Sequence, residues 1–348
     1  MNTANQDILQ SQVRRDLMKR LLGVSAAAIL TPEFLLRAAQ AGTVEKALMG
    51  SPVKDVKPLK LMDNIYYIPA KDKFPSPENK AFFTNIMFID TKDGVVVIDP
   101  SASLQIGQMA IRAIKTVTQK PIIAVINTHF HGDHWMGNQA FAEAYPGIPF
   151  YSMQETATAI NGALGEKWIK MALDATNNAT VGTKIVAPNT FVKAGDVIDF
   201  GGTKVRFYNF GQSHTMYDLV AEVEGTPIVH VGDVMMDHRI AGMDDNEGSF
   251  GNAVKVMAKI KQTMPDRDFF LGHGRHGNAR LAEQTELYET IWNGVNQALK
   301  EGKDAAAAKA WIKAQPFMIE YSKTTPEYDN SLGRWVSFAY LEAEAASF

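Results

Sequence analysis

The chain has 348 residues, of which 46% are hydrophobic and 21% charged, and its formal net charge is −3. This apolar content excludes an intrinsically disordered chain, and the balance of 35 basic and 38 acidic residues gives no broad basic surface for nucleic acid. The sequence contains no cysteine, which excludes disulfides, thiolate zinc sites, iron–sulfur clusters and cysteine nucleophiles. Any metal ion must therefore be held by His, Asp or Glu side chains.

The N-terminal segment has the features of an export signal. Arg14 and Arg15 precede the short apolar run Leu21–Leu30, and an A-x-A pattern ends at Ala41. This order is typical of a twin-arginine signal, so we expect residues 1–41 to direct the chain to the periplasm. The apolar run is about half of the ~20 residues that a spanning helix needs, so no stable membrane span is expected. An amphipathic N-terminal helix and an uncleaved membrane tether are the alternatives.

The rest of the chain alternates between strand and helix patterns. Residues 42–60 mix charge, Pro and Gly and are expected to be a loose lead-in. Short runs rich in β-branched and aromatic residues predict strands at Ile65–Ile68, Thr84–Asp90, Val95–Ile98, Pro121–Asn127, Asp196–Phe200, Lys204–Phe210, Leu219–Val223, Ile228–Val231 and Phe269–Leu271. Helical spacing predicts helices at Ala102–Thr118, Trp135–Ala144, 153–182, Phe250–Gln262, Asn278–Glu301, Asp304–Lys313 and Ser331–Ala346.

The predicted strands form two separated batches, each mixed with helices, and the C-terminal part is helical. This pattern favours a layered α/β fold with a sandwich core, because each sheet must bury its apolar face against another layer. We therefore expect one domain over residues 61–280 and a helical C-terminal extension over residues 281–348 that packs on it.

A dense group of potential metal ligands follows the apolar strand Pro121–Asn127. It consists of His129, His131, Asp133 and His134, at a point where a strand ends and a helix begins. In a tight turn these four side chains can point in two directions, so the loop can serve two adjacent metal ions. Imidazole and carboxylate donors are ligands that zinc accepts.

Three further potential ligands also follow predicted strands. His214 comes after Lys204–Phe210, Asp233 after Ile228–Val231, and His273 after Phe269–Leu271. Taken alone, each could be an ordinary loop or turn residue. Because all three follow strands, as the first four do, we expect them to bind the same metal ions.

These residues make the sequence similar to the metallo-β-lactamase fold superfamily. The H-x-H-x-D-H run of that superfamily is matched at His129 to His134, and its later His, bridging Asp and final His are matched in order. The resemblance implies a four-layer αβ/βα sandwich with two zinc ions per chain. One metal would be bound by His129, His131 and His214, and the other by Asp133, His134 and His273.

The resemblance also implies roles for three aspartates around this centre and for the two zinc ions. Asp233 would bridge the two metals, and Asp133 would orient the nucleophile or carry a proton to the leaving group. Asp99 matches the early Asp of the superfamily and would fix the tautomer of a ligand imidazole; a simple turn Asp before Pro100 is the alternative. Two zinc ions would supply hydroxide at neutral pH.

The implied function is a zinc-dependent hydrolase acting on an ester, thioester, lactone or amide of a small molecule. The ligand set and export signal most resemble exported hydrolases found beside sulfur-oxidation and quinoprotein systems. The alternatives are a mononuclear-iron persulfide dioxygenase, a zinc β-lactamase without a cysteine ligand, and a non-catalytic metal-binding protein. Nucleic acid is not an expected partner, and no oligomeric state is predicted.

Three residues are candidate substrate contacts. Tyr217 and Arg275 lie close in sequence to predicted ligands, and Trp168 lies between the first ligand group and His214, where this fold commonly inserts a lid. A Trp at helical spacing is more often a core residue, which is the alternative for Trp168, and Arg275 equally fits a solvated loop.

Overall fold

Two β-sheets lie at the centre of the chain. The computed structural model describes residues 49–71, 74–237, 239–240 and 248–347, so the predicted signal over residues 1–41 lies outside the described residues. The first sheet has the order β1-β2-β3-β4-β5-β6-β7, with β1 (Leu59–Lys60), β2 (Ile65–Ile68), β3 (Ile86–Asp90), β4 (Val95–Ile98), β5 (Ile122–Ile126), β6 (Phe150–Ser152) and β7 (Thr190–Phe191). The second has the order β12-β11-β10-β9-β8, with β8 (Val197–Phe200), β9 (Thr203–Tyr208), β10 (Val220–Val223), β11 (Ile228–His230) and β12 (Asp268–Phe270).

Alternation along the strands sends successive side chains to different layers. On β3, Phe88 packs in the cluster that contains helix α3 (Leu104–Lys115), whereas Ile89 packs in a second cluster shared with the other sheet. The second cluster also holds Phe207 of β9 and Ala221 of β10, so the two sheets lie face to face. This is the period-2 pattern of a strand that is buried on both faces.

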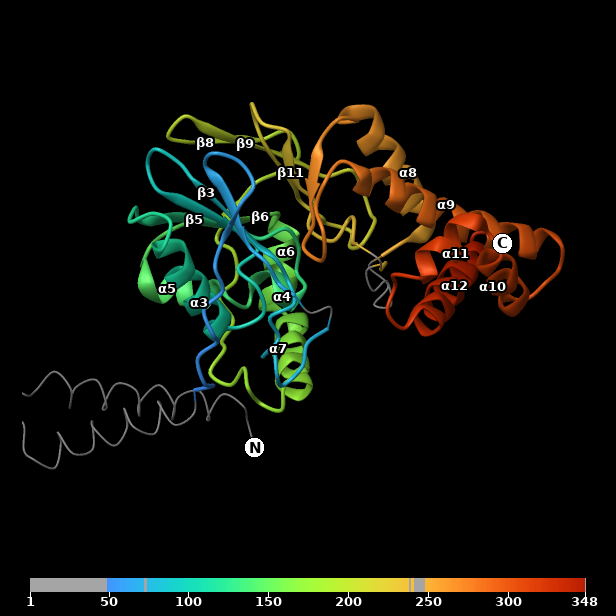
Figure 1. The fold of residues 1–348 in the computed structure, drawn as a ribbon, viewed down its shortest axis with the longest axis horizontal. Coiled ribbons are helices and arrows are strands. Elements are labelled where there is room, and N and C mark those ends of the chain that lie inside the picture. The colour runs from blue at the N-terminus through green and yellow to red at the C-terminus, as the bar shows by residue number, and fades with distance from the viewer. Residues whose placement is uncertain (1–48, 72–73, 238, 241–247, 348) are drawn as a thin grey trace, which may run out of the picture. The chain divides into compact units, whose positions relative to one another are not determined.

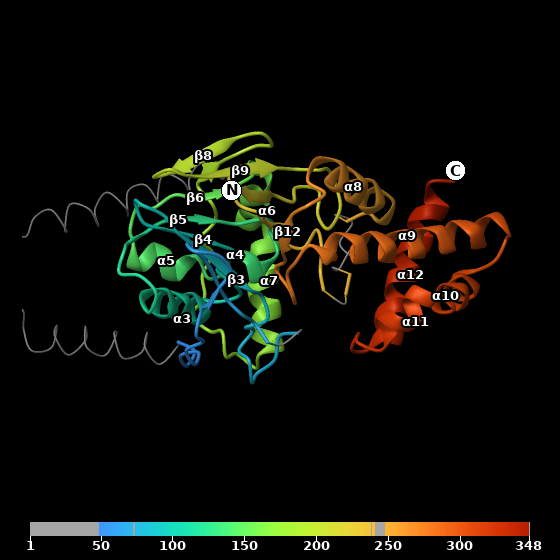
Figure 2. The ribbon, with the colours of Figure 1, turned by 45° about the horizontal axis from the view of Figure 1, so that its top comes forward.

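Helices cover the outer face of each sheet. The helices beside the first sheet include α3, α4 (Gly132–Trp135), α5 (Asn138–Ala144), α6 (Gln154–Asn161) and α7 (Ala163–Ala175). On the second sheet, Val220 and Phe269 pack with α8 (Phe250–Thr263) and α9 (Ala279–Lys300). The layers therefore run helix, sheet, sheet, helix, which confirms the predicted αβ/βα sandwich. In Figures 1 and 2, α3 and α5 lie on the side of the first sheet away from β8 and β9, and α8 lies beside the second sheet.

The C-terminal helices gather around α9. They are α10 (Ala305–Lys313), α11 (Pro316–Ser322) and α12 (Tyr328–Ala345), and all three contact α9 (Figure 2). Leu332 and Val336 of α12 belong to the same buried cluster as Val220 of the second sheet, so the extension shares a core with the sandwich. Among the described residues, no helix combines the length and apolar character needed to cross a membrane.

The predicted helix Trp135–Ala144 is wrong in its bounds, because the structure has two helices there, α4 and α5. The chain turns at Gly137, whose N–H donates to the carbonyl of Ser101 (2.9 Å). A Cβ atom at Gly137 would lie 2.0 Å from the carbonyl oxygen of Pro100, so only glycine fits this close approach. The predicted helix over 153–182 is likewise divided into α6 and α7, and it ends at Ala175.

Four elements of the structure are not predicted by the sequence pattern, namely β1, β6, β7 and α11. Each of these strands has at most three residues, which is too short for alternation to be visible in sequence. β6 and β7 pair in parallel with the first sheet, so their partners are distant in sequence.

The side chain of Glu342 on α12 caps the N-terminus of α8. Its carboxylate accepts hydrogen bonds from the backbone N–H groups of Phe250 (2.6 Å) and Gly251 (3.1 Å) and from the hydroxyl of Ser249 (2.6 Å). A carboxylate at this position also complements the positive end of the helix dipole. Glu342 therefore fixes α12 to the helix that covers the second sheet.

We expect Glu342→Gln to lower the free energy of unfolding by about 1–2 kcal/mol, because it removes the charge that accepts three hydrogen bonds at a helix N-terminus. The measurement is the urea midpoint followed by circular dichroism. Glu344→Gln, at an exposed position on the same helix, is the matched control and is expected to leave the midpoint unchanged. Equal midpoints for both variants would contradict the capping role.

Candidate metal centre

The predicted ligand loop begins where β5 ends and continues into α4. His131 is the residue before α4, and Asp133 and His134 lie within that short helix. The amide of Asn127 donates to the carbonyl of His134 (2.8 Å), and the indole N–H of Trp135 donates to the carbonyl of Phe130 (2.8 Å). These bonds fold the loop back on itself, so its polar side chains face one edge of the two sheets.

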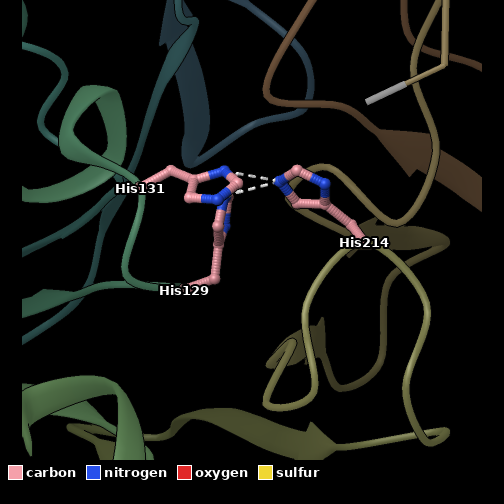
Figure 3. Close-up of side chains that lie close together, drawn as sticks. All are labelled: His129, His131 and His214. Carbon is pink, nitrogen blue, oxygen red and sulfur yellow. Dashed lines mark hydrogen bonds between the residues drawn. The ribbon is translucent and has the colours of Figure 1, made fainter. Parts of the chain in front are cut away.

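The first group of candidate ligands consists of three imidazoles. Nε2 of His214 lies 2.7 Å from Nδ1 of His131 and 3.1 Å from Nε2 of His129, and the three nitrogens converge on one point (Figure 3). Nitrogens bound to one tetrahedral zinc at 2.0–2.1 Å would be about 3.3 Å apart. The spacing of the three donor atoms therefore fits a single metal ion.

The second group combines two carboxylates and two imidazoles, namely Asp133, His134, Asp233 and His273. Nε2 of His273 lies 3.0 Å from Oδ2 of Asp133 and 3.2 Å from Oδ2 of Asp233. The same Asp233 oxygen lies 3.8 Å from Nε2 of His214, which belongs to the first group. Asp233 therefore stands between the two groups, as a bridging ligand would.

Hydrogen bonds fix which nitrogen of two imidazoles is available to a metal ion. Nδ1 of His134 lies 2.8 Å from the Asp99 carboxylate, and Nδ1 of His273 lies 2.9 Å from the carbonyl oxygen of Phe83. Because a carbonyl oxygen can only accept, Nδ1 of His273 carries the proton and Nε2 keeps its lone pair. The Nε2 atoms of His134 and His273 are buried and make no hydrogen bond within the described part of the chain. Both nitrogens lie 3.0 to 3.4 Å from Oδ2 of Asp133 and Oδ2 of Asp233, so all four atoms can bind one metal ion.

Asp99 connects two parts of the ligand loop. Besides its contact with His134, its carboxylate accepts hydrogen bonds from the N–H (2.8 Å) and the hydroxyl (2.7 Å) of Thr128. The Thr128 oxygen lies 3.0 Å from Nδ1 of His129, so Asp99 orients ligands of both groups. Asp99 is fully buried and has a left-handed backbone with φ of 53°. These contacts favour the orienting role over a simple turn residue.

The buried carboxylates and imidazoles of the cluster shift one another's pKa. Although burial opposes protonation, Asp233 and Asp133 hold the pKa of His134 well above its usual value, and Asp233 raises the pKa of His273. Burial, together with the neighbouring His134 and His214 imidazoles, holds the pKa of His129 well below its usual value. Burial opposes ionisation of Asp133 and Asp233, yet the adjacent imidazoles hold the pKa of both carboxyls well below their usual range. The buried carboxylates therefore need positive charge beside them, which a divalent cation supplies.

A cavity of about 380 Å³ opens onto both ligand groups. Its wall includes Trp168, whose ring packs 4.7 Å from that of His131, and Phe83, whose ring stacks 5.2 Å from that of His273. The predicted substrate contact Trp168 therefore lines the cavity at the metal centre. Each ligand group has one aromatic ring beside it, Trp168 at His131 and Phe83 at His273. The sequence analysis missed Phe83, Lys167, Arg239 and Arg334, which also line this cavity.

The other two predicted contacts lie elsewhere. Tyr217 is not among the residues that line the cavity. Arg275 lines a neighbouring cavity of about 540 Å³. Its guanidinium forms a bidentate ion pair with Asp237, in which each carboxylate oxygen accepts one hydrogen bond of 2.9 Å. Neither side chain lines the cavity that opens onto both ligand groups, although the cavity of Arg275 is also lined by His273.

Comparison with known proteins places the chain in a family. The model of the metallo-beta-lactamase superfamily matches residues 79–273, which contain all seven candidate ligands. The chain belongs to the metallo-beta-lactamase superfamily. The family resemblance inferred from the motif at His129 to His134 is thereby confirmed. The sequence matches none of the curated proteins with which it was compared.

Solved structures with this superfamily fold differ in how much of the chain they match. A metallo-beta-lactamase from Pontibacter korlensis matches with a TM-score of 0.54 at 16% identity, over 68% of this chain and 99% of its own. A sec-alkylsulfatase from Pseudomonas sp. matches with a TM-score of 0.59 at 14% identity, over 82% of this chain. This chain spans about half the length of the alkylsulfatase, of which 50% is covered. At these identities the likeness concerns the fold.

We expect Asp99→Asn to weaken metal binding by this superfamily member about 10- to 100-fold, because the amide no longer orients His134 and Thr128 as the carboxylate does. The measurement is competition with a chromophoric chelator. Asp199→Asn, at an exposed position on β8, is the matched control and should bind metal as the unaltered protein does. Unchanged affinity in the Asp99 variant would show that Asp99 serves only the turn.

Proposed function

We propose that the protein is a periplasmic, zinc-dependent hydrolase with two metal ions per chain. Its proposed substrate is a small ester, thioester, lactone or amide. The observation that carries this proposal is the division of seven buried His and Asp side chains into two adjacent groups joined by Asp233. None of the seven is more than 6% exposed.

The donor set fits zinc. Buried nitrogen and carboxylate oxygen donors, three and four to a group, are the ligands zinc accepts in sites without thiolates. His129, His131 and His214 would hold one ion, and Asp133, His134 and His273 the other, with Asp233 between them. When bound, two zinc ions would acidify water enough to supply hydroxide near pH 7 and would polarise the substrate oxygen.

The residues of the chain then position the reacting groups. In hydrolysis the water oxygen forms a bond to the carbonyl carbon, the bond to the leaving group breaks, and the leaving group takes up a proton. Asp133 lines the cavity, and its Oδ2 accepts a hydrogen bond from the hydroxyl of Thr84 (2.6 Å), which fixes the carboxylate plane. We assign Asp133 to orient the water and to carry the proton to the leaving group.

The metal content distinguishes this proposal from the iron dioxygenase alternative. A single iron held by two His and one Asp would leave ligands of the second group without a role. Activity on a panel of substrates distinguishes the remaining alternatives. The panel includes a β-lactam, and a sulfate ester because one structural neighbour is an alkylsulfatase.

We expect protein purified from the native compartment to contain close to two zinc ions per chain by elemental analysis. Removal of the metal with a chelator should abolish hydrolysis of the panel, and zinc should restore it. His214→Ala removes one ligand of the first group and should lower the zinc content towards one. About one iron per chain with little zinc, and oxygen consumption on a persulfide, would overturn the hydrolase proposal.

The proposed location is supported by the order of Arg14-Arg15, the apolar run Leu21–Leu30 and the A-x-A pattern at Ala41. We expect replacement of both arginines by lysine to retain the protein in the cytoplasm, because the twin-arginine route requires the pair. Cell fractionation followed by immunoblotting measures this. Replacement of Arg20 and Arg37 by lysine is the matched control, and equal export of both variants would count against this route.

A further inference from the structure

We propose that the cavity beside the metal centre selects substrates that carry a negative charge next to a short apolar group, and that Arg334 on α12 is a specificity-determining residue. This inference rests on the proposed hydrolase function and names its substrate class. Arg334 lies outside residues 79–273, to which the superfamily model matches, so the selectivity would come from the C-terminal extension of this chain.

Three cationic side chains from separate parts of the chain line the cavity. They are Lys167 on α7, Arg239 in the segment between β11 and α8, and Arg334 on α12. The only carboxylates in the described lining are Asp133 and Asp233, which are both assigned to the metals. Two divalent ions would add four positive charges, so the loaded cavity has a large positive excess. Such a cavity attracts an anion and disfavours a cation.

The two arginines differ in their surroundings. Arg239 is half-buried and interacts electrostatically with Asp133 and Asp233, and its guanidinium lies 5.5 Å from the centre of the Phe74 ring. Its charge is therefore partly directed at the ligand carboxylates. Arg334 on α12 lines the same cavity and is exposed, and a guanidinium can bind a carboxylate or sulfate through two parallel hydrogen bonds. We therefore assign Arg334 to contact a substrate anion that enters the cavity.

The rest of the lining is apolar and provides the second half of the recognition. It consists of Phe74, Pro75, Phe83, Trp168, Met171 and Met236. A second, smaller cavity of about 80 Å³ shares lining residues with the first, among them Phe83, Trp168 and Asp133. Its remaining walls are alanine, proline and methionine side chains, so a short alkyl group fits there.

The test uses two esters with the same leaving group and the same acyl length, 4-nitrophenyl butyrate and 4-nitrophenyl hemisuccinate. The second differs by a terminal carboxylate. We expect the zinc-loaded protein to prefer the hemisuccinate in kcat/KM, and the preference to decrease as salt is added. We expect Arg334→Gln to lower the ratio of the two kcat/KM values about tenfold, mainly through KM, and Arg334→Lys to retain most of it.

Lys300→Gln on α9 removes an exposed cation that does not line the cavity and is expected to leave the ratio unchanged. A second readout does not depend on turnover. The zinc-loaded protein should bind N-phenylsuccinamate more tightly than N-phenylbutyramide by calorimetry, and Arg334→Gln should remove that difference while both zinc ions remain bound.

A preference for the neutral ester, or a ratio that Arg334→Gln does not change, would overturn the inference and leave the hydrolase proposal intact. Two bound zinc ions with no hydrolysis of any ester would instead count against the proposed function. In that case the difference in binding of the two amides would still support or refute the selection of anions.

Discussion

The carboxylate of Asp99 is the contact on which the geometry of the metal centre depends. It holds the backbone and hydroxyl of Thr128 and the ring of His134, and through the Thr128 oxygen it also orients His129. Because it is buried at the end of β4, its position is set by the packing of the first sheet. The ligand loop is thus attached to a fully buried part of the first sheet, which favours ligands that are in place before a metal ion arrives.

Hydrogen bonds between the loops of the two sheets bring the remaining ligands to the same edge. The backbone N–H of Asn85, beside β3, donates to the carbonyl of Gly272, and its side-chain amide donates to the carbonyls of Leu271 and Gly274. These three carbonyls surround His273. On the other side, the N–H of Leu219 donates to the carbonyl of Thr128 (2.9 Å). The sheet edge that carries the candidate ligands is therefore held together by loops of both sheets.

The sequence allowed the ligands to be predicted far better than the walls of the cavity. The residues from His129 to His134 are recognisable because metal chemistry limits the residue types and a single loop carries them. Phe83 and Arg334 carry no such local signal, since their closeness to the metals depends on how β3 and α12 pack. The strands were predicted where apolar residues are consecutive or alternate over three or more positions. β6 and β7, with three and two residues, were missed because their pairing is decided by distant neighbours. The predicted helix Trp135–Ala144 is divided at Gly137 because that residue packs against the backbone of Pro100 and Ser101. Hydrophobic periodicity gives no information about such a contact with a distant loop.

Each ligand group draws its members from both sheets, and this has a mechanical consequence. His129 and His131 follow a strand of the first sheet, whereas His214 follows a strand of the second; Asp133 and Asp233 are divided in the same way. A bound ion would thus act as a cross-link between the two halves of the sandwich, closing a loop of the order of 100 residues and restricting the unfolded chain much as a disulfide does. For a protein without cysteine, the metals would take the place of covalent cross-links, and loss of metal would loosen the contact between the sheets as well as stop the chemistry.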